Sequence, residues 1–468
     1  MIRPLLSLIL TLAISSWASA RSVGEVYANF CAGCHGPELN GGSAPSLIDD
    51  VWTHGSDDES LARAIAQGWP DEGMPPFEKA LSSPEIRALV VYLQEGHAKA
   101  ARPPAVADDA QDRQTFTSRE HNFRLEIVAE GLDEPWSIAW LPDGRMLITE
   151  KSGRLRLFAE GQLDPTPIKG IPEVYDQGQG GLLEVALHPH YADNGWIYLA
   201  YSDPLTQVIG PTESMTKIVR GRLVDHAWVD QQTIWQAPPS SYRSGGPHYG
   251  CRIAFDAGGY LFFSHGERGQ QDKAQDLSLP NGKIYRVYDD GRIPADNPFV
   301  NTPGALPSIW SYGHRNPQGL AFEPATGLLW ETEHGPRGGD ELNTIRPKAN
   351  YGWPVITFGM NYNGTPITAL TAKAGMEPPV VQWTPSPAVC GIDFYIGDQF
   401  PRWSGNLFVT ALAGQHLRRV VVHEGRVTDQ EILLQGIGRV RDVANGPDGY
   451  LYLVLNRPGK IVRLVPVE

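Results

Sequence analysis

The sequence predicts a multidomain protein in which a small all-α domain precedes an all-β six-bladed propeller. Three observations support this fold class. Helical periodicity runs from residue 22 to residue 100, the stretch from Ala98 to Gln114 has almost no large apolar side chains, and from about residue 121 a glycine turn followed by a short strand pattern recurs six times. The expected parts are a signal peptide at 1–20, the helical domain at 21–100, a linker rich in Ala and Pro at 101–120 and the propeller at 121–468.

The first twenty residues have the features of an export signal. Arg3 supplies a positive charge, Leu5 to Ile14 form an apolar stretch, and Ala18-Ser19-Ala20 is typical of a cleavage site. The apolar stretch is too short to span a membrane, and no later stretch approaches the roughly 18 apolar residues that a span needs. We therefore expect a cleaved signal peptide and a periplasmic or secreted protein without a membrane span.

The composition is that of an acidic globular protein. Of the 468 residues, 41% are hydrophobic and 20% are charged, and the formal net charge is −14. Proteins that bind nucleic acid need basic patches to neutralise phosphates, so nucleic acid is not an expected partner. The acidic balance is interpreted as a contribution to solubility, and nothing in these numbers indicates an oligomeric state.

The helical domain contains the most specific motif of the chain, Cys31-Ala32-Gly33-Cys34-His35. Two cysteines at this spacing can form thioethers to one porphyrin edge, and the adjacent histidine is an axial iron ligand. A structural zinc site would require two further Cys or His ligands at a suitable spacing. The motif therefore predicts covalent haem c, attached through Cys31 and Cys34 and ligated by His35, and a function that includes electron transfer.

The second iron ligand is expected from a loop before the last helix of this domain. That helix is predicted over Pro84–Leu93 with Ser83 as its N-cap, and another over Ser60–Ala66. Met74 lies between them in Gly73-Met74-Pro75-Pro76-Phe77, an arrangement that resembles the small class I cytochromes c, in which a loop Met binds the iron and raises its potential. His54 is the competing candidate, and we interpret it as a surface histidine.

The six turn-and-strand units imply six blades, because one such unit is expected in each. They are Asp143–Thr149, Asn194–Leu199, Gly258–Phe263, Thr326–Trp330, Ser404–Val409 and Asp448–Leu453. Blades of four strands tolerate loop insertions, which explains the uneven spacing of the units. A β-sandwich of about 350 residues in one unit would be unusual. In a propeller, loops of different blades converge at the mouth of the channel, where we expect the chemistry.

Several segments rich in glycine and polar residues stand where strands should end. They are 177–183, 246–250, 266–268, 312–320, 333–341, 350–354 and 439–442. Together they provide a histidine, carboxylates and several arginines on loops of different blades. Such a set can bind a multiply anionic ligand and abstract a proton beside it.

At these segments the chain resembles the soluble quinoprotein sugar dehydrogenases, six-bladed propellers that use pyrroloquinoline quinone (PQQ) and Ca²⁺ to oxidise aldoses. The resemblance covers essentially all of 121–468 and is most specific at Gly313–Leu320 and from Gly335 to Tyr351. The haem domain is an addition to the simplest members. The resemblance therefore implies PQQ and Ca²⁺ as cofactors beside haem c.

The resemblance also implies the catalytic residues. His248 would take the proton from the anomeric hydroxyl while the hydride passes to the quinone, and Glu267 would orient its imidazole and stabilise the charged form. The glucose enzymes carry Asp at this second position. Arg315 would stabilise negative charge on the quinone oxygens, and Gln179 matches a residue near the sugar and a quinone carbonyl.

The remaining matches concern cofactor binding. Arg315 and Asn316 match the pair that contacts the quinone. Arg439 and Arg441 alternate on one strand and match the clamp on the PQQ carboxylates, although an Arg-Val-Arg strand is by itself usually a solvated face. In contrast, Ala413 stands where the family often has a lysine that meets the quinone, so cofactor affinity could be lower or compensated elsewhere.

Two calcium sites are implied. The backbone carbonyls of Gly335 and Pro336 match ligands of the cofactor Ca²⁺, which prefers hard oxygen donors. Glu341 and Tyr351 match a second, structural calcium site, although an acidic residue after glycines is by itself usually part of a turn.

The two remaining cysteines, Cys251 and Cys390, allow two interpretations. An exported protein could join them in a disulfide, or both could be buried thiols. The sequence alone leaves both open.

The expected function is that of a periplasmic quinohaemoprotein. It would oxidise aldoses at C1 to lactones and pass electrons through haem to an external one-electron acceptor, such as a cytochrome or a respiratory component. One alternative keeps the cofactors and changes the substrate to another alcohol or sugar derivative. Another is a propeller that binds a partner or glycan without turnover and uses haem as a redox sensor.

Overall fold

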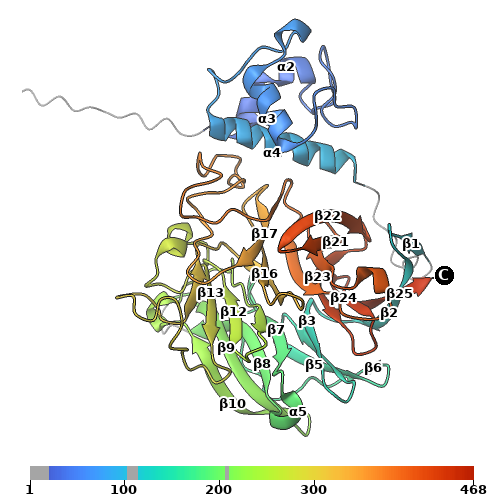
Figure 1. Cartoon of the computed structure of the whole chain (residues 1–468), viewed down its shortest axis with the longest axis vertical. Helices are drawn as coiled ribbons and strands as arrows, with labels where there is room; N and C mark the ends of the chain where they lie inside the picture. The colour runs from blue at the N-terminus through green and yellow to red at the C-terminus, as the bar shows by residue number, and fades with distance from the viewer. Residues whose placement is uncertain (1–20, 103–113, 206–209, 468) are drawn as a thin grey trace, which may run out of the picture.

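The computed structural model describes residues 21–102, 114–205 and 210–467, so the expected signal peptide lies outside the described residues. The helical domain sits on one face of a larger β domain (Figure 1). No helix within the described ranges has the length and apolar character needed to cross a membrane.

The helical domain is built from four short or medium helices around one apolar core. The helices are α1 (Val23–Phe30), α2 (Ala32–His35), α3 (Asp58–Gln67) and α4 (Ser83–Ala100), with a 3-10 turn η1 (Pro70–Glu72) between the last two. Ser22 and Glu25 form a capping box at α1. Ser82, not the expected Ser83, is the N-cap of α4, because its side chain and Glu85 form the capping box there.

The β domain consists of six antiparallel sheets, which confirms the predicted six-bladed propeller. One blade contains β3 (Pro135–Trp140), β4 (Met146–Glu150), β5 (Arg154–Ala159) and β6 (Gln162–Leu163). The next contains β7 (Leu182–Leu187), β8 (Ile197–Leu205), β9 (Glu213–Val224) and β10 (Ala227–Gln236). A third contains β11 (Ile253–Phe255), β12 (Leu261–His265), β13 (Lys283–Val287) and β14 (Ile309–Tyr312). A fourth blade contains β15 (Pro317–Phe322), β16 (Leu329–Glu333), β17 (Asp340–Ile345) and β18 (Val381–Trp383). A fifth contains β19 (Val389–Phe394), β20 (Leu407–Ala411), β21 (His416–His423) and β22 (Arg426–Leu433). The sixth has the order β1 (Thr115–Thr117), β2 (Asn122–Glu130), β25 (Lys460–Val467), β24 (Leu451–Arg457) and β23 (Arg439–Asn445).

The first strands of the blades form the inner ring. β3, β7, β11, β15, β19 and β23 each contact the first strand of the blade on either side. Each of the six predicted glycine turns joins the first strand of a blade to its second, and the turn glycines have φ between 67° and 87°. This left-handed conformation favours glycine, which explains why the same residue recurs at the same place in every blade. These hairpins therefore share one face of the ring.

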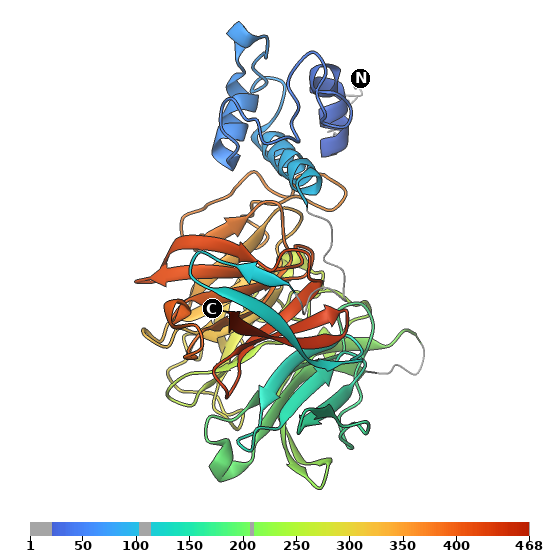
Figure 2. The same cartoon turned by 90° about the vertical axis from the view of Figure 1, so that its right-hand side faces the viewer.

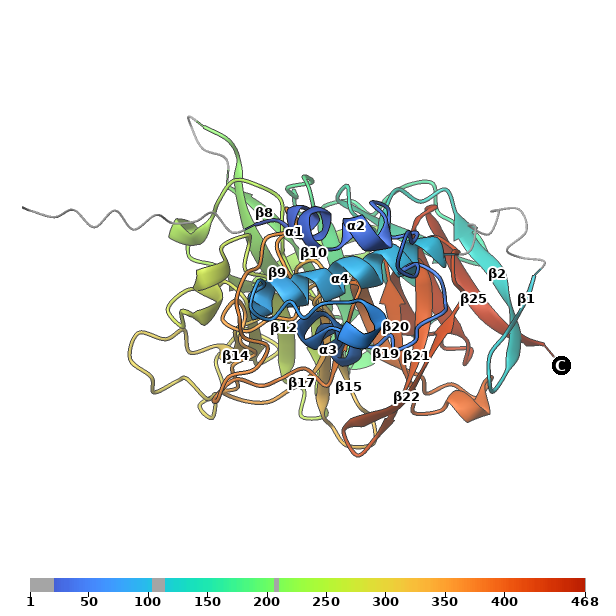
Figure 3. The same cartoon turned by 90° about the horizontal axis from the view of Figure 1, so that it is seen from above.

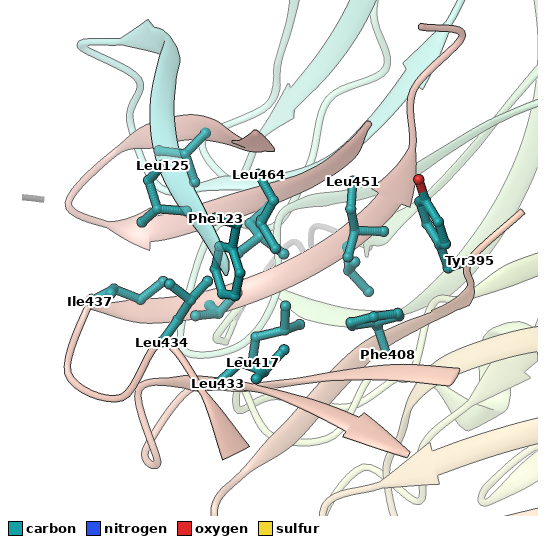
Figure 4. Close-up of a cluster of buried hydrophobic side chains, with 14 of the residues drawn as sticks. Phe123, Leu125, Tyr395, Phe408, Leu417, Leu433, Leu434, Ile437, Leu451 and Leu464 are labelled. Atoms are coloured by element: carbon teal, nitrogen blue, oxygen red, sulfur yellow. The ribbon is translucent and has the colours of Figure 1, made fainter. Parts of the chain in front are cut away.

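The ring closes by pairing the two ends of the β domain. β2 pairs antiparallel with β25, with Asn122 opposite Val467 and Glu130 opposite Lys460. Figure 4 shows the core beneath this closure, where Phe123 and Leu125 of β2 lie beside Leu464 of β25 and side chains of the preceding blade. Closure thus joins the chain ends through both hydrogen bonds and an apolar cluster.

The helical domain contacts the propeller mainly through α4. Figures 1 and 2 show α4 as the element of this domain nearest the β strands, and Figure 3 shows it running across the top of the propeller. Met360, from the long β17–β18 connection, is buried in the core cluster of the helical domain. The two domains therefore share a continuous packed interface.

Candidate active site and haem site

The predicted site residues of the propeller come from one face of the ring, opposite the glycine hairpins. Gln179, His248 and Arg315 precede the inner strands β7, β11 and β15, while Glu267 and Gly335 follow the second strands β12 and β16. Because neighbouring strands of a blade are antiparallel, the start of the first strand and the end of the second lie at the same end of the sheet. The fold therefore gathers loops from several blades at one mouth.

His248 and Glu267 form the centre of this group. His248 Nδ1 hydrogen-bonds to Glu267 Oε1, and Glu267 is buried, with 1% of its surface exposed. This bond leaves Nε2 as the ring nitrogen that can take a proton. Burial lowers the pKa of His248, and the neighbouring Arg315 lowers it further. The imidazole is therefore held in its neutral form, as a general base requires.

An amide network links His248 to the neighbouring loops. Gln179 Oε1 accepts hydrogen bonds from the backbone N–H of His248 at 2.9 Å and from Asn316 Nδ2 at 3.3 Å. Asn316 Oδ1 accepts from the backbone N–H of Gly250 at 3.1 Å and from Gln318 Nε2 at 3.2 Å. The network fixes the loop that carries His248, which has a φ of 53°.

Two predicted arginines extend this network. Arg441 Nη1 donates to Gln318 Oε1 at 2.9 Å, and Arg315 Nη1 donates to the carbonyl of His334 at 2.8 Å. The Nε atoms of both arginines are buried without a hydrogen-bond partner among the described residues. Unpaired buried donors of this kind are costly, so these guanidinium groups fit an anionic ligand that the described residues do not provide.

Arg439 lies beside Arg441 on β23, but the strand is irregular there. The pairing of β23 with β24 shifts register on both sides of Val440, so the two arginines are not simple alternating members of a regular strand. Both arginines are near enough to His334 for their positive charges to add to the burial that lowers the pKa of its imidazole. His334 was not singled out from the sequence.

The loop from Gly335 to Gly339 is tightly folded. A Cβ on Gly335 would lie 1.6 Å from the carbonyl oxygen of Gly339, so only glycine fits there. The carbonyl of Pro336 accepts hydrogen bonds from Ser386 Oγ and from the backbone N–H of Gly339, both at 3.1 Å. The Pro336 carbonyl therefore already has two hydrogen-bond donors, and a hard cation bound to this oxygen would replace one of them.

A buried carboxylate cluster lies in the blade formed by β15 to β18, on strands β16 and β17. Glu331 and Glu333 of β16 stand opposite Asn343 and Glu341 of β17, and the ligand atoms of Glu331, Glu333 and His314 lie within 4.8 Å of one another. Burial raises the pKa of Glu331 and of Glu341 well above the ordinary value, and the charge of Glu333 adds to both shifts. Buried carboxylates at this density fit a metal cation.

Only part of the predicted second calcium set lies in this cluster. Glu341 is a member, whereas the Tyr351 hydroxyl donates to the carbonyl of Thr344 at 2.5 Å and its ring stacks on His314 at 4.6 Å. The sequence reasoning missed Glu331, Glu333 and His314. The alternation Glu331-Thr332-Glu333 on a buried strand was the available signal, because alternate residues of a strand face one side.

In the haem motif, one ring nitrogen of His35 is hydrogen-bonded and the other is available to bind iron. His35 Nδ1 donates to the carbonyl of Pro45 at 2.9 Å, which leaves Nε2 for the metal. Cys31 and Cys34 are both free, and Cys34 is exposed. These residues fit a covalently attached haem.

Met74 and His54 differ in how their side chains are engaged. His54 stacks on Trp69 with ring centroids 3.7 Å apart, and its Nε2 contacts Glu72 at 3.0 Å. Met74 is half-buried in the loop after η1, and Phe77 of the same loop packs edge-on against Phe30, next to the haem motif. His54 is half-buried between these partners, and the choice of Met74 over His54 as the iron ligand stays a prediction.

Cys251 and Cys390 are both free, buried thiols in the described structure, so they form no disulfide with each other. Cys390 Sγ lies 3.3 Å from both Arg441 Nη1 and His334 Nε2. Ala413 follows β20 at the same mouth, where its carbonyl accepts a hydrogen bond from Arg102 at 2.7 Å. A positive side chain from the end of the helical domain therefore reaches the position at which the sequence lacks a lysine.

Comparison with known proteins places both domains. Residues 132–463 match the family described as Glucose / Sorbosone dehydrogenase, and residues 18–93 match the family described as Cytochrome C oxidase, cbb3-type, subunit III. Aldose sugar dehydrogenase YliI of Escherichia coli (strain K12) is 43% identical over 349 residues, which cover 73% of this chain and 92% of that protein.

Solved structures resemble the propeller over its whole length. The apo-form of the soluble aldose sugar dehydrogenase from Escherichia coli aligns with a TM-score of 0.70 and 41% identity, covering 74% of this chain and all of that one. The PQQ-bound form of an aldose sugar dehydrogenase from Streptomyces coelicolor aligns with a TM-score of 0.59 and 29% identity, covering 74% of this chain and 98% of that one.

Proposed function

This chain belongs to the glucose/sorbosone dehydrogenase family of propeller oxidoreductases and carries a cytochrome c domain, and from this premise we propose that it is an exported aldose-oxidising quinohaemoprotein. Its proposed reaction is oxidation of the sugar C1 hydroxyl to the lactone. The two electrons would leave through the haem domain to an external one-electron acceptor. Export to the periplasm rests on the signal-like residues 1–20.

One observation carries the proposal, namely the neutral His248 hydrogen-bonded to a buried Glu267 beside the guanidinium of Arg315. A base held next to a fixed positive charge suits a reaction in which a hydroxyl loses its proton while negative charge develops on an acceptor. A binding module without turnover has no need of this pairing.

When bound, PQQ with Ca²⁺ would supply a two-electron acceptor polarised by a Lewis acid, and haem c would supply a one-electron carrier. His248 Nε2 takes the proton of the anomeric hydroxyl, and the carboxylate of Glu267 stabilises the resulting imidazolium. Glu267 performs this task although the glucose enzymes carry Asp, because its longer side chain still reaches Nδ1. Gln179 holds the His248 loop and lies at the sugar-binding side.

Cofactor binding is assigned to the unpaired donors and the folded glycine loop. Arg315 and Asn316 would hold the quinone, and Arg439 and Arg441 would hold its carboxylates. The buried, unpaired Nε atoms of Arg315 and Arg441 support this assignment. The carbonyls of Gly335 and Pro336 bind the cofactor calcium. The Arg102 guanidinium adds positive charge near Ala413.

The second calcium is assigned to the blade that carries Glu341 and Tyr351. The buried cluster around Glu341 supports this assignment, because four acidic or imidazole side chains without a cation would carry a large desolvation cost. In the haem domain, Cys31 and Cys34 hold the haem, and His35 and Met74 are assigned as the iron ligands.

Reconstitution tests this function directly. The purified protein is loaded with PQQ and Ca²⁺, mixed anaerobically with a panel of aldoses, and followed in the quinone and haem absorption bands. We expect both bands to become reduced with an aldose and neither with a non-sugar alcohol. Reduction by the alcohol alone would change the substrate class, and no reduction by any compound would refute the proposal.

A further inference from the structure

The contact between the two domains lies on the loop that carries the proposed calcium ligands. Arg337, directly after Pro336, donates through Nε to both carboxylate oxygens of Glu95 at 2.9 Å and through Nη2 to one of them. Glu95 belongs to α4. Both side chains are partly buried, with 25% and 27% of their surfaces exposed. This two-pronged ion pair therefore joins the helical domain to the cofactor loop itself.

A second arginine fastens α4 to the neighbouring propeller loops. Arg87 donates to the carbonyl of Phe358 at 2.6 Å and to Thr384 Oγ1 at 2.7 Å. Ser386, two residues beyond Thr384, hydrogen-bonds to the carbonyl of Pro336 and accepts from the N–H groups of Gly338 and Gly339. The segment that receives α4 is thus also the segment that shapes the Pro336 loop.

The backbones approach closely between these polar contacts. A Cβ on Gly338 would lie 2.4 Å from Val91 of α4, so a larger residue would separate the two domains. At the start of the helical domain, the N–H of Val23 donates to the carbonyl of Gly364 at 2.9 Å. Contacts therefore extend along the whole length of the shared face.

Side chains connect this face to the haem motif without interruption. Tyr92, on the same helix as Glu95, packs against the core cluster of the helical domain, which contains Val91 of the contact with Gly338 and Met360 of the propeller. Its ring centroid lies 5.3 Å from that of Tyr27, and the Tyr27 hydroxyl donates to the carbonyl of Gly36 at 2.7 Å. Gly36 follows His35 directly. A continuous packed route thus leads from the Pro336 loop to the residue after the proposed iron ligand.

We propose that the contact of α4 with the loop at 335–338 is the interface for electron transfer within the chain, and that Arg337 and Glu95 are its positioning residues. The proposal rests on the proposed function above. Oxidation of C1 releases two electrons and two protons. Each electron would reduce one Fe(III) to Fe(II), and the external acceptor would reoxidise the iron between the two. The hydroxyl proton would leave through His248, and the proton that comes from the hydride would leave from the reduced cofactor to solvent.

The arrangement also separates the two electron partners. Figure 1 shows α2, which contains Cys34 and His35, on the side of the helical domain away from the propeller, with α4 on the near side. Cys34 is exposed there. The near side is occupied by the propeller, and the side of α2 remains for the external acceptor.

The test uses full-length protein loaded with haem, PQQ and Ca²⁺, and follows quinone and haem reduction separately by stopped flow. In wild type we expect first-order haem reduction whose rate does not depend on protein concentration. Glu95→Arg should slow haem reduction by roughly tenfold or more and make it depend on concentration, because two like charges replace a partly buried ion pair. Quinone reduction by sugar should be unchanged.

Two further variants separate positioning from a general structural effect. The double variant Glu95→Arg with Arg337→Glu restores the opposite charges and should recover most of the lost rate. Glu59→Arg, which reverses an exposed charge on α3, is the matched control for Glu95→Arg. Small-angle X-ray scattering of the oxidised protein gives a readout without turnover: Glu95→Arg should increase the maximum dimension, and the double variant should reverse it.

The outcomes distinguish this inference from the proposed function. If Glu95→Arg reduces its haem at the wild-type rate, or wild-type haem reduction depends on protein concentration, the interface is not the route of transfer. If no sugar reduces the quinone, the proposed function fails, and loading the apoprotein anaerobically with chemically reduced PQQ still measures transfer to haem in all variants.

Discussion

Replacement of Glu267 by Gln isolates the contribution of a carboxylate to the proposed base. In wild type, Glu267 is buried and bonded to His248 Nδ1, while burial and Arg315 lower the pKa of the imidazole. A hydrogen bond to a charged group is worth about 1.5–3 kcal/mol. If this stabilisation applies to the imidazolium formed during proton transfer, Glu267→Gln should lower the rate of quinone reduction by about 10- to 200-fold, since each 1.36 kcal/mol is a factor of ten.

The same variant should shift the pH dependence in a defined direction. Glu267 raises the pKa of His248, opposing burial and Arg315. Its removal lowers that pKa, so the neutral imidazole persists to lower pH and the rising limb of the rate profile moves toward acid. The plateau above this limb should nevertheless be lower.

The assay is single-turnover reduction of bound PQQ by one aldose, measured by stopped flow between pH 5 and pH 9. Glu323→Gln is a suitable control, because Glu323 is also buried and hydrogen-bonded but lies away from the mouth, beside Trp330. A Glu267→Gln plateau equal to that of wild type, or an alkaline shift of the limb, would refute the reasoning.

Three other outcomes are expected. His248→Ala should slow quinone reduction by about 10²- to 10⁴-fold while PQQ and haem stay bound, and loss of PQQ from this variant would make His248 a cofactor ligand. Met74→Ala should lower the haem potential and open the iron to added ligands such as imidazole; an unchanged potential and spectrum would move the assignment to His54. Glu331 and Glu341 have raised pKa values in the folded state, so deprotonating them without a cation lowers the stability of the fold. The melting temperature of the chelated protein should therefore fall as the pH rises from 5 to 8, whereas that of the Ca²⁺-loaded protein should not. Equal pH dependence of the two forms would argue against a cation at this cluster.

Much of the fold was readable because the same physical requirement recurs in every blade. A left-handed turn between the first and second strands demands glycine, and six such turns on a strand period identify six blades. The haem motif was equally readable, since its spacing follows from the porphyrin. In contrast, the observed N-cap of α4 lies one residue before the predicted one. Ser82 and Ser83 are both suitable caps, and the capping box with Glu85 selects Ser82.

Contacts between distant segments could not be read in this way. The cluster of Glu331, Glu333 and His314 depends on the register of β16 and on the conformation of the loop between β14 and β15, neither of which local pattern determines. The irregular pairing beside Arg441 could not be predicted either, because the sequence Arg439-Val440-Arg441 has the alternating pattern of a regular strand. The position of α4 on the propeller depends on the ion pair of Arg337 with Glu95, which are 242 residues apart in the sequence.

The pairing of β2 with β25 has a consequence for how the protein is made. β25 is synthesised after every other strand of the ring, whereas its partner β2 is among the first, so the apolar cluster that contains Phe123 and Leu464 stays incomplete until β25 has emerged. The helical domain needs few such distant partners and can acquire its structure earlier. Emergence of β25 is therefore the step that allows the ring to close, and a chain truncated before Lys460 should expose apolar surface and be removed by proteases.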